Sequence, residues 1–345
     1  MAAKPRRNAS SENRIRVVLV AHGEAAGAGL IENFRISWRT LSHAAHVMRL
    51  PAPLRVMICT LGSLRKRLAN RPGSIHNDMT QRQAIALQQA LGDDPDNQYE
   101  VVVAFASAPP YTEALIANSD SADRLFMLSM IPSDSRLSCG LICHPLKAAG
   151  DAARRRTTVL ARLWDSPKLT AVHCEHIAQH FPAIESGSPC CLVLVLHGTI
   201  VKDEQGRKPD FHTGEAEKAE YADALKSALL AMPERPWQRV ELAYVNHGVG
   251  GQWSSPTLPE LLTRLGSEGV GSVVAYACEH LVDGGETSQL PQVLAAGPVP
   301  ETHCLPCLNE SGAFIDYLAE RVREAAADAA GRTCGPCPLE RLGTR

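Results

Sequence analysis

The chain has 345 residues, of which 45% are hydrophobic, and its formal net charge is -2. This length is enough for two domains with sizeable cores, and the near-neutral charge argues against nucleic acid as a partner. No apolar stretch approaches the roughly 20 residues that a membrane-spanning helix needs. We therefore expect a globular, cytoplasmic protein.

The first 15 residues are basic and polar, and a strand pattern follows them directly, without the apolar region of a signal peptide. This composition predicts a disordered basic tail over residues 1–15. A basic tail can touch an anionic membrane surface, but a solvated tail is the simpler interpretation.

Beyond the tail, the apolar pattern alternates between strands and helices. Strands are predicted at 17–21, 54–60, 101–106, 125–131, 192–196, 240–245 and 273–277. Helices are predicted at 30–47, 80–91, 110–118, 148–164, 216–231, 257–265 and 312–330. This alternation is typical of α/β proteins of the doubly wound kind. We predict two similar lobes, each a parallel sheet flanked by helices, with a cleft between them.

The same pattern predicts how the chain is divided. An amino-terminal lobe is predicted over 16–182 and a carboxy-terminal lobe over 183–330, because the Gly, Ser and Pro residues of 181–189 mark a boundary. A Cys-containing tail follows over 331–345.

An apolar run that ends in His-Gly occurs twice, at 16–23 and at 191–198. Each run predicts a buried strand, and its His, His22 or His197, stands where the strand ends. Ligands of open parallel α/β sheets bind at the carboxyl ends of the strands. Both imidazoles are therefore placed where chemistry usually occurs in such folds.

Four segments of the second half resemble, in sequence and in order, the ferrochelatase family: LVLVLHGT, AYVNHGVGGQWSSPTLPELLTRL, VVAYACEHLVDGGETSQL and CLPCLNESGAFIDYLAERV. The first half agrees more loosely, through SIHNDMTQRQAIALQQAL, VVVAFASAPPYTEAL and IPSDSRLSCG. Ferrochelatases insert ferrous iron into a porphyrin in haem biosynthesis. The resemblance implies a lyase of this kind, with Fe²⁺ and a porphyrin, protoporphyrin IX or coproporphyrin, as substrates.

The resemblance also implies site residues. His197 matches the family's His-Gly, where a neutral imidazole can accept a pyrrole proton and ligate the metal. Matching Glu279-His280 to the family's Asp-His puts Val282 where the family has its principal catalytic Glu. Glu286 stands one helical turn later and is the predicted acid partner, on the same face as Val282 if the segment is helical. His197 and Glu286 are also the predicted ligands of the substrate iron.

Three residues are expected to contact the porphyrin. Tyr244 and Trp253 match family positions by context, and aromatic rings can stack on a macrocycle, although core packing explains either ring equally well. His280 is expected beside the cleft, as are His22 and His247. Four arginines near the first helix either pair with the propionates or form a solvated helix face: Arg35, Arg39, Arg49 and Arg55.

The chain has 11 cysteines, which we expect to be reduced thiols. Cys304 and Cys307 form one Cys-x-x-Cys pair, and Cys334 and Cys337 form another, so together they supply the four thiolates of a metal site. Because some ferrochelatases carry a [2Fe-2S] cluster near the carboxyl terminus, the resemblance implies such a cluster here, with Cys139 as an alternative ligand. Zinc, or no metal, stays open.

Two other functions stay open from the sequence. A non-catalytic porphyrin- or haem-binding paralogue is favoured by Val282. A cobalt or nickel chelatase that acts on a sirohydrochlorin-type tetrapyrrole would use His22 as much as His197. Peripheral contact with a membrane is compatible with either function, because porphyrins are poorly soluble. The sequence predicts no particular oligomeric state.

Overall fold

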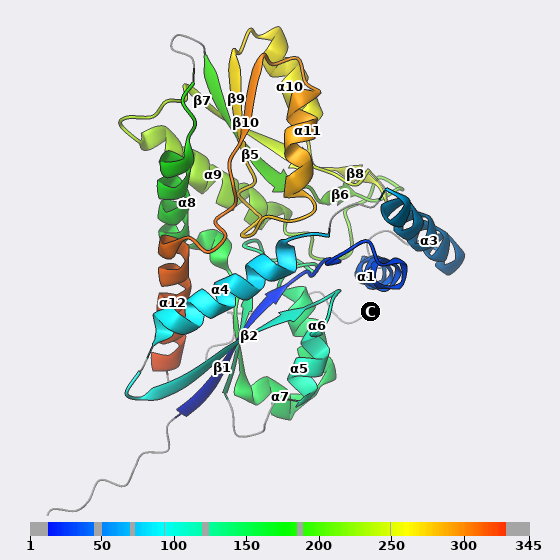
Figure 1. Ribbon diagram of the computed structural model, residues 1–345, viewed down its shortest axis with the longest axis vertical. Helices are drawn as coiled ribbons and strands as arrows, with labels where there is room; N and C mark the ends of the chain where they lie inside the picture. The colour runs from blue at the N-terminus through cyan, green and yellow to red at the C-terminus, as the bar shows by residue number, and fades with distance from the viewer. Residues whose placement is uncertain are drawn as a thin grey trace, which may run out of the picture.

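The computed structural model describes residues 13–44, 50–69, 73–92, 94–118, 124–184, 189–248 and 250–328. Two separate parallel sheets of four strands lie at the centres of two lobes, with helices around them (Figure 1). The predicted fold class is confirmed. The predicted tails lie outside the described residues, apart from residues 13–15, and the predicted division at residue 182 stays a prediction.

The first sheet has the strand order β2-β1-β3-β4, and all its strands are parallel. Its strands are β1 (Asn13–Ala21), β2 (Asn97–Phe105), β3 (Arg124–Ser129) and β4 (Thr157–Leu160). The helices of this half are α1 (Leu30–His43), α3 (Ala52–Leu68), α4 (His76–Leu91), α5 (Thr112–Asn118), α6 (Gly140–Ala148), α7 (Asp151–Arg156) and the 3₁₀ helix η1 (Leu163–Asp165).

The second sheet has the order β10-β9-β5-β7 and is also parallel. Its strands are β5 (Cys190–His197), β7 (Arg239–Val245), β9 (Ser272–Tyr276) and β10 (Glu301–Cys304), and β6 (Ile200–Lys202) and β8 (Gln252–Trp253) form a small antiparallel ribbon. The remaining helices are α8 (Pro167–His180), α9 (Glu215–Ala231), α10 (Leu258–Ser267), η2 (Thr287–Gln289), α11 (Leu290–Ala295) and α12 (Gly312–Ala327).

One continuous apolar core runs through both lobes. Val17 of β1 and Leu192 of β5 face this shared core, to which α4, α8, α9 and α12 contribute. Successive strand residues point to opposite faces of a sheet, so Val18 and Val193 face two separate outer cores, one in each lobe. Both faces of both sheets are covered, which is why residues 17–21 of β1 and 190–196 of β5 are continuously apolar.

Two predicted elements are wrong. Residues 54–60, predicted as a strand, lie in α3, because the apolar side chains of 54–68 recur every three or four residues. Residues 148–164, predicted as one helix, contain α7, β4 and η1. The β-branched residues of 157–160 pair with β3 at the edge of the sheet. The pattern also missed α8 and β10.

Helix α8 follows the first sheet in the chain but is anchored to the second lobe through His173. The Nδ1 atom of His173 lies 2.6 Å from the Tyr276 hydroxyl, and its Nε2 atom lies 2.6 Å from the Tyr221 hydroxyl. Because Tyr221 donates its own hydrogen to the Cys278 carbonyl at 2.9 Å, Nε2 of His173 must carry a proton and Nδ1 must accept one. Burial, with a contribution from His176, lowers the pKa of His173 to about 3, so the ring is neutral.

The substitution His173→Phe should weaken the pH dependence of stability. Between pH 6.5 and about 3, the unfolded chain binds a proton on His173 that the folded protein excludes, so acid favours unfolding in this window. The variant should be less stable at pH 7, by about 1–3 kcal/mol, since it leaves the Tyr276 hydroxyl without its acceptor. It should nevertheless lose less stability than the wild type on acidification to about pH 4.5. Urea denaturation at both pH values measures this, and equal losses in the two proteins would contradict the neutral, buried assignment.

Candidate active site

His197 is the last residue of β5, and the chain turns sharply immediately after it. The Gly198 N–H donates to the Val245 carbonyl at 2.8 Å. A Cβ atom on Gly198 would lie 1.7 Å from Oδ1 of Asn246, so only glycine fits this turn. The His197 ring is therefore held at the carboxyl end of the second sheet, as the sequence predicts.

A buried ion pair holds the main chain of His197 on both sides. Glu279 accepts the His197 N–H at 3.0 Å, and the ammonium group of Lys218 donates to the His197 carbonyl at 2.6 Å. Lys218 and Glu279 lie 2.9 Å apart, and Ser133, from the first lobe, donates to Glu279 as well. Burial raises the pKa of Glu279, but the charge of Lys218 and these hydrogen bonds outweigh it, and the net pKa lies below the ordinary value.

The hydrogen bonds of His197 fix its tautomer. Its Nδ1 atom lies 2.7 Å from the Gly198 carbonyl oxygen, which can only accept, so Nδ1 carries the hydrogen and Nε2 keeps a lone pair. Burial lowers the pKa of His197 to about 4; Glu286 acts to raise this pKa, and the nearby Lys218 and His247 act to lower it. At neutral pH the ring is therefore uncharged and available as a base or a metal ligand.

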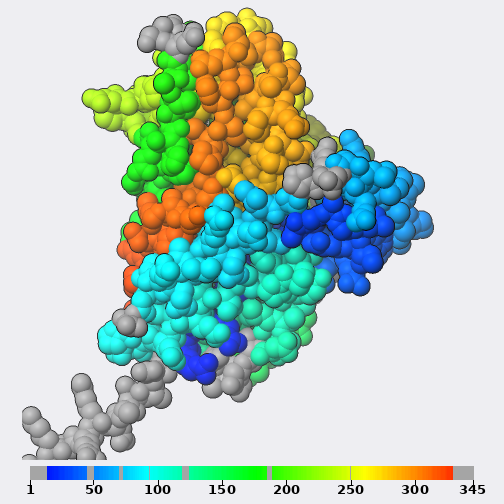
Figure 2. Space-filling model, viewed as in Figure 1, coloured from blue at the N-terminus to red at the C-terminus, as the bar shows by residue number. Residues whose placement is uncertain are grey.

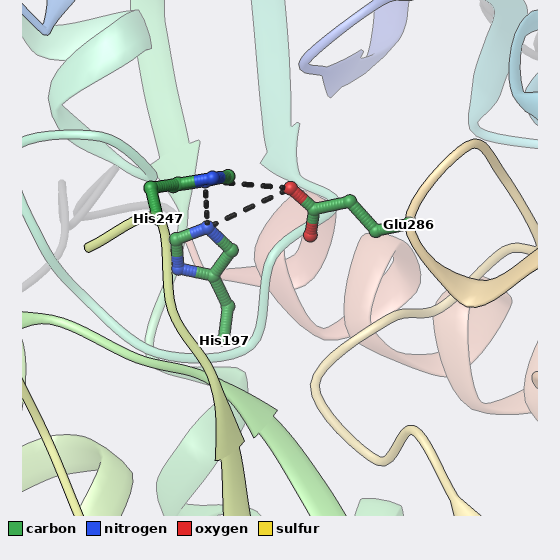
Figure 3. A group of neighbouring side chains, drawn as sticks. All are labelled: His197, His247 and Glu286. Carbon is green, nitrogen blue, oxygen red and sulfur yellow. Dashed lines mark hydrogen bonds and ion pairs between the residues drawn. The ribbon is translucent and has the colours of Figure 1, made fainter. Parts of the chain in front are cut away.

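The lone pair of His197 faces two other potential ligands (Figure 3). Nε2 of His247 lies 2.9 Å from Nε2 of His197. One oxygen of Glu286 lies 3.7 Å from His197 and 3.6 Å from His247. These three ligand atoms lie within 4.8 Å of one another, and no other set of three such groups does so in the part of the chain that the structure describes. Two imidazoles and a carboxylate suit a divalent first-row metal ion.

Glu286 reaches this position from a loop and not from a helix. Residues 278–286 form turns before η2 begins, so the predicted helical face shared by Val282 and Glu286 does not exist. Val282 is buried, and Asp283 is bonded to Asn309 at 2.7 Å. Of Asp283 and Glu286, Glu286 is the one whose carboxylate approaches the His197 ring.

The loop that carries Glu286 rests on the first lobe. Glu24, three residues beyond β1, accepts the Gly285 N–H at 2.8 Å. A Cβ atom on Gly285 would lie 3.0 Å from the Glu24 carboxylate, and one on Gly284 would lie 3.3 Å from His76. The two glycines thus let the loop lie directly against Glu24 and His76, and this contact places Glu286.

His280 holds the other oxygen of Glu286, at 3.1 Å. Burial lowers the pKa of His280, but its hydrogen bond to Glu286 and the charge of Glu286 raise the pKa by more. The net pKa of His280 therefore lies above the ordinary value. Burial raises the pKa of Glu286, but the hydrogen bond from His280 and the electrostatic influence of the neighbouring imidazoles lower it far below its ordinary value. Glu286 is therefore an ionised carboxylate shared between His280 and the pair of His197 and His247.

Trp253 lies beside the imidazoles, whereas Tyr244 packs toward the core. The Trp253 ring centroid is 5.7 Å from that of His247, edge to face, and 6.4 Å from that of His197. Tyr244 lies on β7, opposite Leu196 of β5, and packs against the shared core. Their contact with a porphyrin stays a prediction.

The first lobe holds further predicted site residues: His22, which follows β1, and the arginines near the first helix. Nε2 of His22 lies 3.2 Å from the Thr40 hydroxyl, and burial, with a contribution from His76, lowers the pKa of His22 to about 4. The four predicted arginines differ: Arg39 pairs with Glu113, Arg55 stacks on Trp38, Arg35 is exposed, and Arg49 lies outside the described residues.

The predicted cluster ligands are only partly described. Burial raises the pKa of the Cys304 thiol to about 11 and that of the Cys307 thiol further, and both pack in the outer core of the second lobe. Cys139 belongs to the outer core of the first lobe. Within the described ranges no third ligand joins Cys304 and Cys307. Cys334 and Cys337 lie outside those ranges, so the cluster stays a prediction.

The sequence did not identify His247 as a ligand or Glu24 as a support. A signal for His247 was present, since a His-Gly pair, His247-Gly248, stands just beyond β7 as His197-Gly198 stands at the end of β5. No pattern in the sequence marks Glu24, because its partner lies 261 residues further along the chain.

The fold and this site together define a two-lobed α/β protein with a candidate divalent-metal site at the junction of its sheets. A family model described as Ferrochelatase matches residues 14–326, nearly the whole chain. The chain therefore belongs to the ferrochelatase family, as its motifs predicted.

Several known proteins are similar to the chain. The ferrochelatase of Synechocystis sp. is 25% identical over 352 residues, which cover 95% of this chain and 85% of that protein. The ferrochelatase of Acidobacterium capsulatum is 23% identical over 288 residues, which cover 78% and 82%. Two solved structures, of CbiX, described as the terminal enzyme for biosynthesis of siroheme in denitrifying bacteria, and of SirB from Bacillus subtilis with Fe³⁺, each align with a TM-score of 0.49. They are 15% and 13% identical to this chain, and the alignments cover 90% and 93% of it and 99% and 98% of those chains.

Removing Lys218 should destabilise the protein strongly. The substitution Lys218→Met leaves the buried carboxylate of Glu279 without its counter-charge, which costs about 3–5 kcal/mol. Lys226→Met, at a half-buried position on the same helix, is the matched control and should change stability by less than about 1 kcal/mol. Urea denaturation compares the two. Similar losses in both variants would show that the buried pair does not hold His197.

The three facing side chains should bind a divalent ion. Co²⁺, followed by its visible absorbance at pH 7, should bind the wild type, and His197→Ala, His247→Ala and Glu286→Gln should each weaken it by tenfold or more. His303→Ala, which removes an imidazole bonded to Glu301 on β10, is the control and should bind Co²⁺ normally. Binding that survives loss of His247 would contradict the three-ligand site.

Proposed function

We propose that the protein is a porphyrin metal chelatase that inserts ferrous iron into protoporphyrin IX or coproporphyrin, with release of two protons, in haem biosynthesis. The observation that carries this proposal is the approach of Glu286 to His197, at 3.7 Å. Val282 removes the acid expected from the family, and Glu286 supplies another acid to the same imidazole. Membership of the ferrochelatase family supports the same class of reaction.

In this proposal the iron is a substrate that His197, His247 and Glu286 receive and pass on. The His197 ring is neutral at pH 7, so it binds a cation without first losing a proton. The ionised Glu286 offsets part of the charge of the ion as it leaves water. Trp253 forms an apolar wall next to both imidazoles.

The same side chains can take up the protons that the porphyrin loses. Nε2 of His197 keeps a lone pair that faces His247, and the imidazolium that forms on proton uptake lies beside the negative charge of Glu286. The low pKa of His197 favours prompt release of that proton to the next acceptor. His280, bonded to the other oxygen of Glu286, is the adjacent titratable group on this route.

The remaining parts of the proposal concern porphyrin contacts, cofactor and location. We propose that Tyr244 and His280, together with Trp253, contact the porphyrin. The proposal also includes a [2Fe-2S] cluster on Cys304, Cys307 and the terminal cysteines. Among the described residues, no helix is both long and apolar enough to cross a bilayer. We propose a cytoplasmic protein that touches a membrane only peripherally.

One alternative has an observation of its own. His22 directly follows β1 in the first lobe, and His197 ends β5 in the second, which suits a chelatase that uses both imidazoles on a sirohydrochlorin-type tetrapyrrole. Cobalt or nickel would suit the same nitrogen-rich ligand set. For the non-catalytic binder, the approach of Glu286 to His197 weakens the argument from Val282.

Anaerobic insertion of Fe²⁺ into protoporphyrin or coproporphyrin tests the proposal. The wild type should be active, and His197→Ala and Glu286→Gln should lose about a hundredfold or more in rate, because each removes a group that handles protons or metal. His303→Ala, with its imidazole on β10, should retain wild-type activity. Tight porphyrin binding without turnover would establish a binding protein. Turnover that requires sirohydrochlorin and His22 would establish the alternative chelatase.

A further inference from the structure

Gln83, on α4 of the first lobe, is fully buried and bonds to the second lobe. Its Nε2 group donates to the Leu281 carbonyl at 3.0 Å and to the Asn309 carbonyl at 2.7 Å. These partners lie 198 and 226 positions further along the chain. In the space-filling view, the cyan surface of α4 borders the yellow and orange surface of the second lobe (Figure 2). A single amide thus joins α4 to two separate segments of the second lobe.

The two ends of this amide are used unequally. Because carbonyl oxygens can only accept, the nitrogen of the amide must be the atom that faces Leu281 and Asn309. The amide oxygen, Oε1, is buried and has no hydrogen-bond partner among the described residues. A buried acceptor without a partner destabilises a fold, and a methionine of similar size would bring no such acceptor. What only Gln83 supplies at this position is therefore its pair of donors.

The two carbonyls belong to segments that are bonded to each other. The Asn309 N–H donates to the Leu281 carbonyl at 3.0 Å. The Asn309 side chain donates to the Asp283 carboxylate at 2.7 Å and accepts the Asp283 N–H at 2.9 Å. Asn309 has a φ of 46°, a left-handed conformation that asparagine tolerates better than most residues. Residues 281–283 and Asn309 thus form one hydrogen-bonded unit, to which Gln83 is attached from the first lobe.

This unit lies directly before the candidate ligand Glu286, which follows Asp283 by three residues. Helix α4 also contacts the stretch between them, because a Cβ atom on Gly284 would lie 3.3 Å from His76. His76 and Gln83 are seven positions apart, about two helical turns, so they share one face of α4. That face therefore supports the loop before Glu286 at two points.

We propose that Gln83 is a positioning residue of the metal site, whose two hydrogen bonds set the loop from which Glu286 reaches His197. Gln83 contacts no ligand directly and acts through Leu281 and Asn309. Residues that orient a metal ligand in this way contribute roughly ten- to a hundredfold to metal affinity. The inference rests on the proposed function only in taking the bound ion to be the iron that is inserted into the porphyrin.

Co²⁺ binding to the full chain, followed by its visible absorbance, tests the proposal. Gln83→Met should weaken Co²⁺ binding about tenfold. Gln88→Met is the matched control, because Gln88 lies on the same helix and bonds to Tyr99 and Val101 of the first lobe's own sheet, at 3.1 and 2.8 Å. It should bind Co²⁺ like the wild type. Circular dichroism of each variant confirms that it is folded.

A double-mutant cycle separates positioning from general stabilisation. In a protein that already carries Glu286→Gln, Gln83→Met should weaken Co²⁺ binding less than about twofold further, because the carboxylate that it positions is gone. A residue that only stabilises the fold would weaken binding by the same factor with and without Glu286→Gln. That outcome overturns the proposal, as does equal binding by Gln83→Met and the wild type, or a wild type that binds no Co²⁺.

Asp283→Asn tests the same link if Gln83→Met does not fold. The substitution keeps the size of the side chain but replaces one of the two oxygens that accept from Asn309 and Cys307 by an amide nitrogen, which cannot accept. It should weaken Co²⁺ binding about tenfold in the wild type and have little effect in the presence of Glu286→Gln. Equal effects in both proteins overturn the proposal.

Iron insertion distinguishes this proposal from the proposed function. If both hold, Gln83→Met should raise the KM for Fe²⁺ about tenfold and leave the KM for the porphyrin unchanged. A wild type that inserts no iron, together with the expected result of the Co²⁺ cycle, removes the proposed function and keeps the positioning role. An active wild type whose Gln83→Met variant binds Co²⁺ normally removes the positioning role alone.

Discussion

The buried ion pair of Lys218 and Glu279 is the interaction on which the site depends. Two opposite charges in an apolar interior are stable only together and with their remaining hydrogen bonds satisfied. Here those bonds go to both main-chain groups of His197, so the charges hold in place the residue whose ring lies at the candidate site. The ring itself is left uncharged, with its proton directed to the neighbouring carbonyl and its lone pair outward.

The two lobes contribute differently to this arrangement. The second lobe supplies the facing ligands His197, His247 and Glu286. The first lobe supplies supports: Ser133 bonds to Glu279, and Glu24 bonds to the loop of Glu286. The resemblance matches Val282 to the acid of the family, and the loop with Gly284 and Gly285 brings Glu286 to the His197 imidazole.

The central features of the fold could be read from the sequence because they depend on local pattern. Continuous Val and Leu runs in β1 and β5 reflect burial on both faces, and His197 at a strand end followed from that pattern. The errors arose where local pattern is ambiguous. The run at 54–60 has enough β-branched residues for a strand, and its helical spacing is visible only over the whole of α3.

The support from Glu24 and Ser133 could not be predicted, because each joins residues more than a hundred positions apart and carries no periodic signal. His247 was undervalued for a different reason. Its match to the family was imperfect, although the strand before it and the Gly after it repeat the local pattern of His197.

The supports from the first lobe also tie metal affinity to the distance between the lobes. Ser133 bonds to Glu279, and Glu24 bonds to Gly285, so each first-lobe residue contacts the second lobe directly. A separation of the lobes beyond hydrogen-bond length breaks both bonds, and Glu279 and the loop of Glu286 lose their first-lobe support together. If His197, His247 and Glu286 hold an ion, the ion and the contacts between the lobes stabilise each other by thermodynamic reciprocity. Two contacts between the lobes thus govern the relative positions of all three side chains at the candidate site.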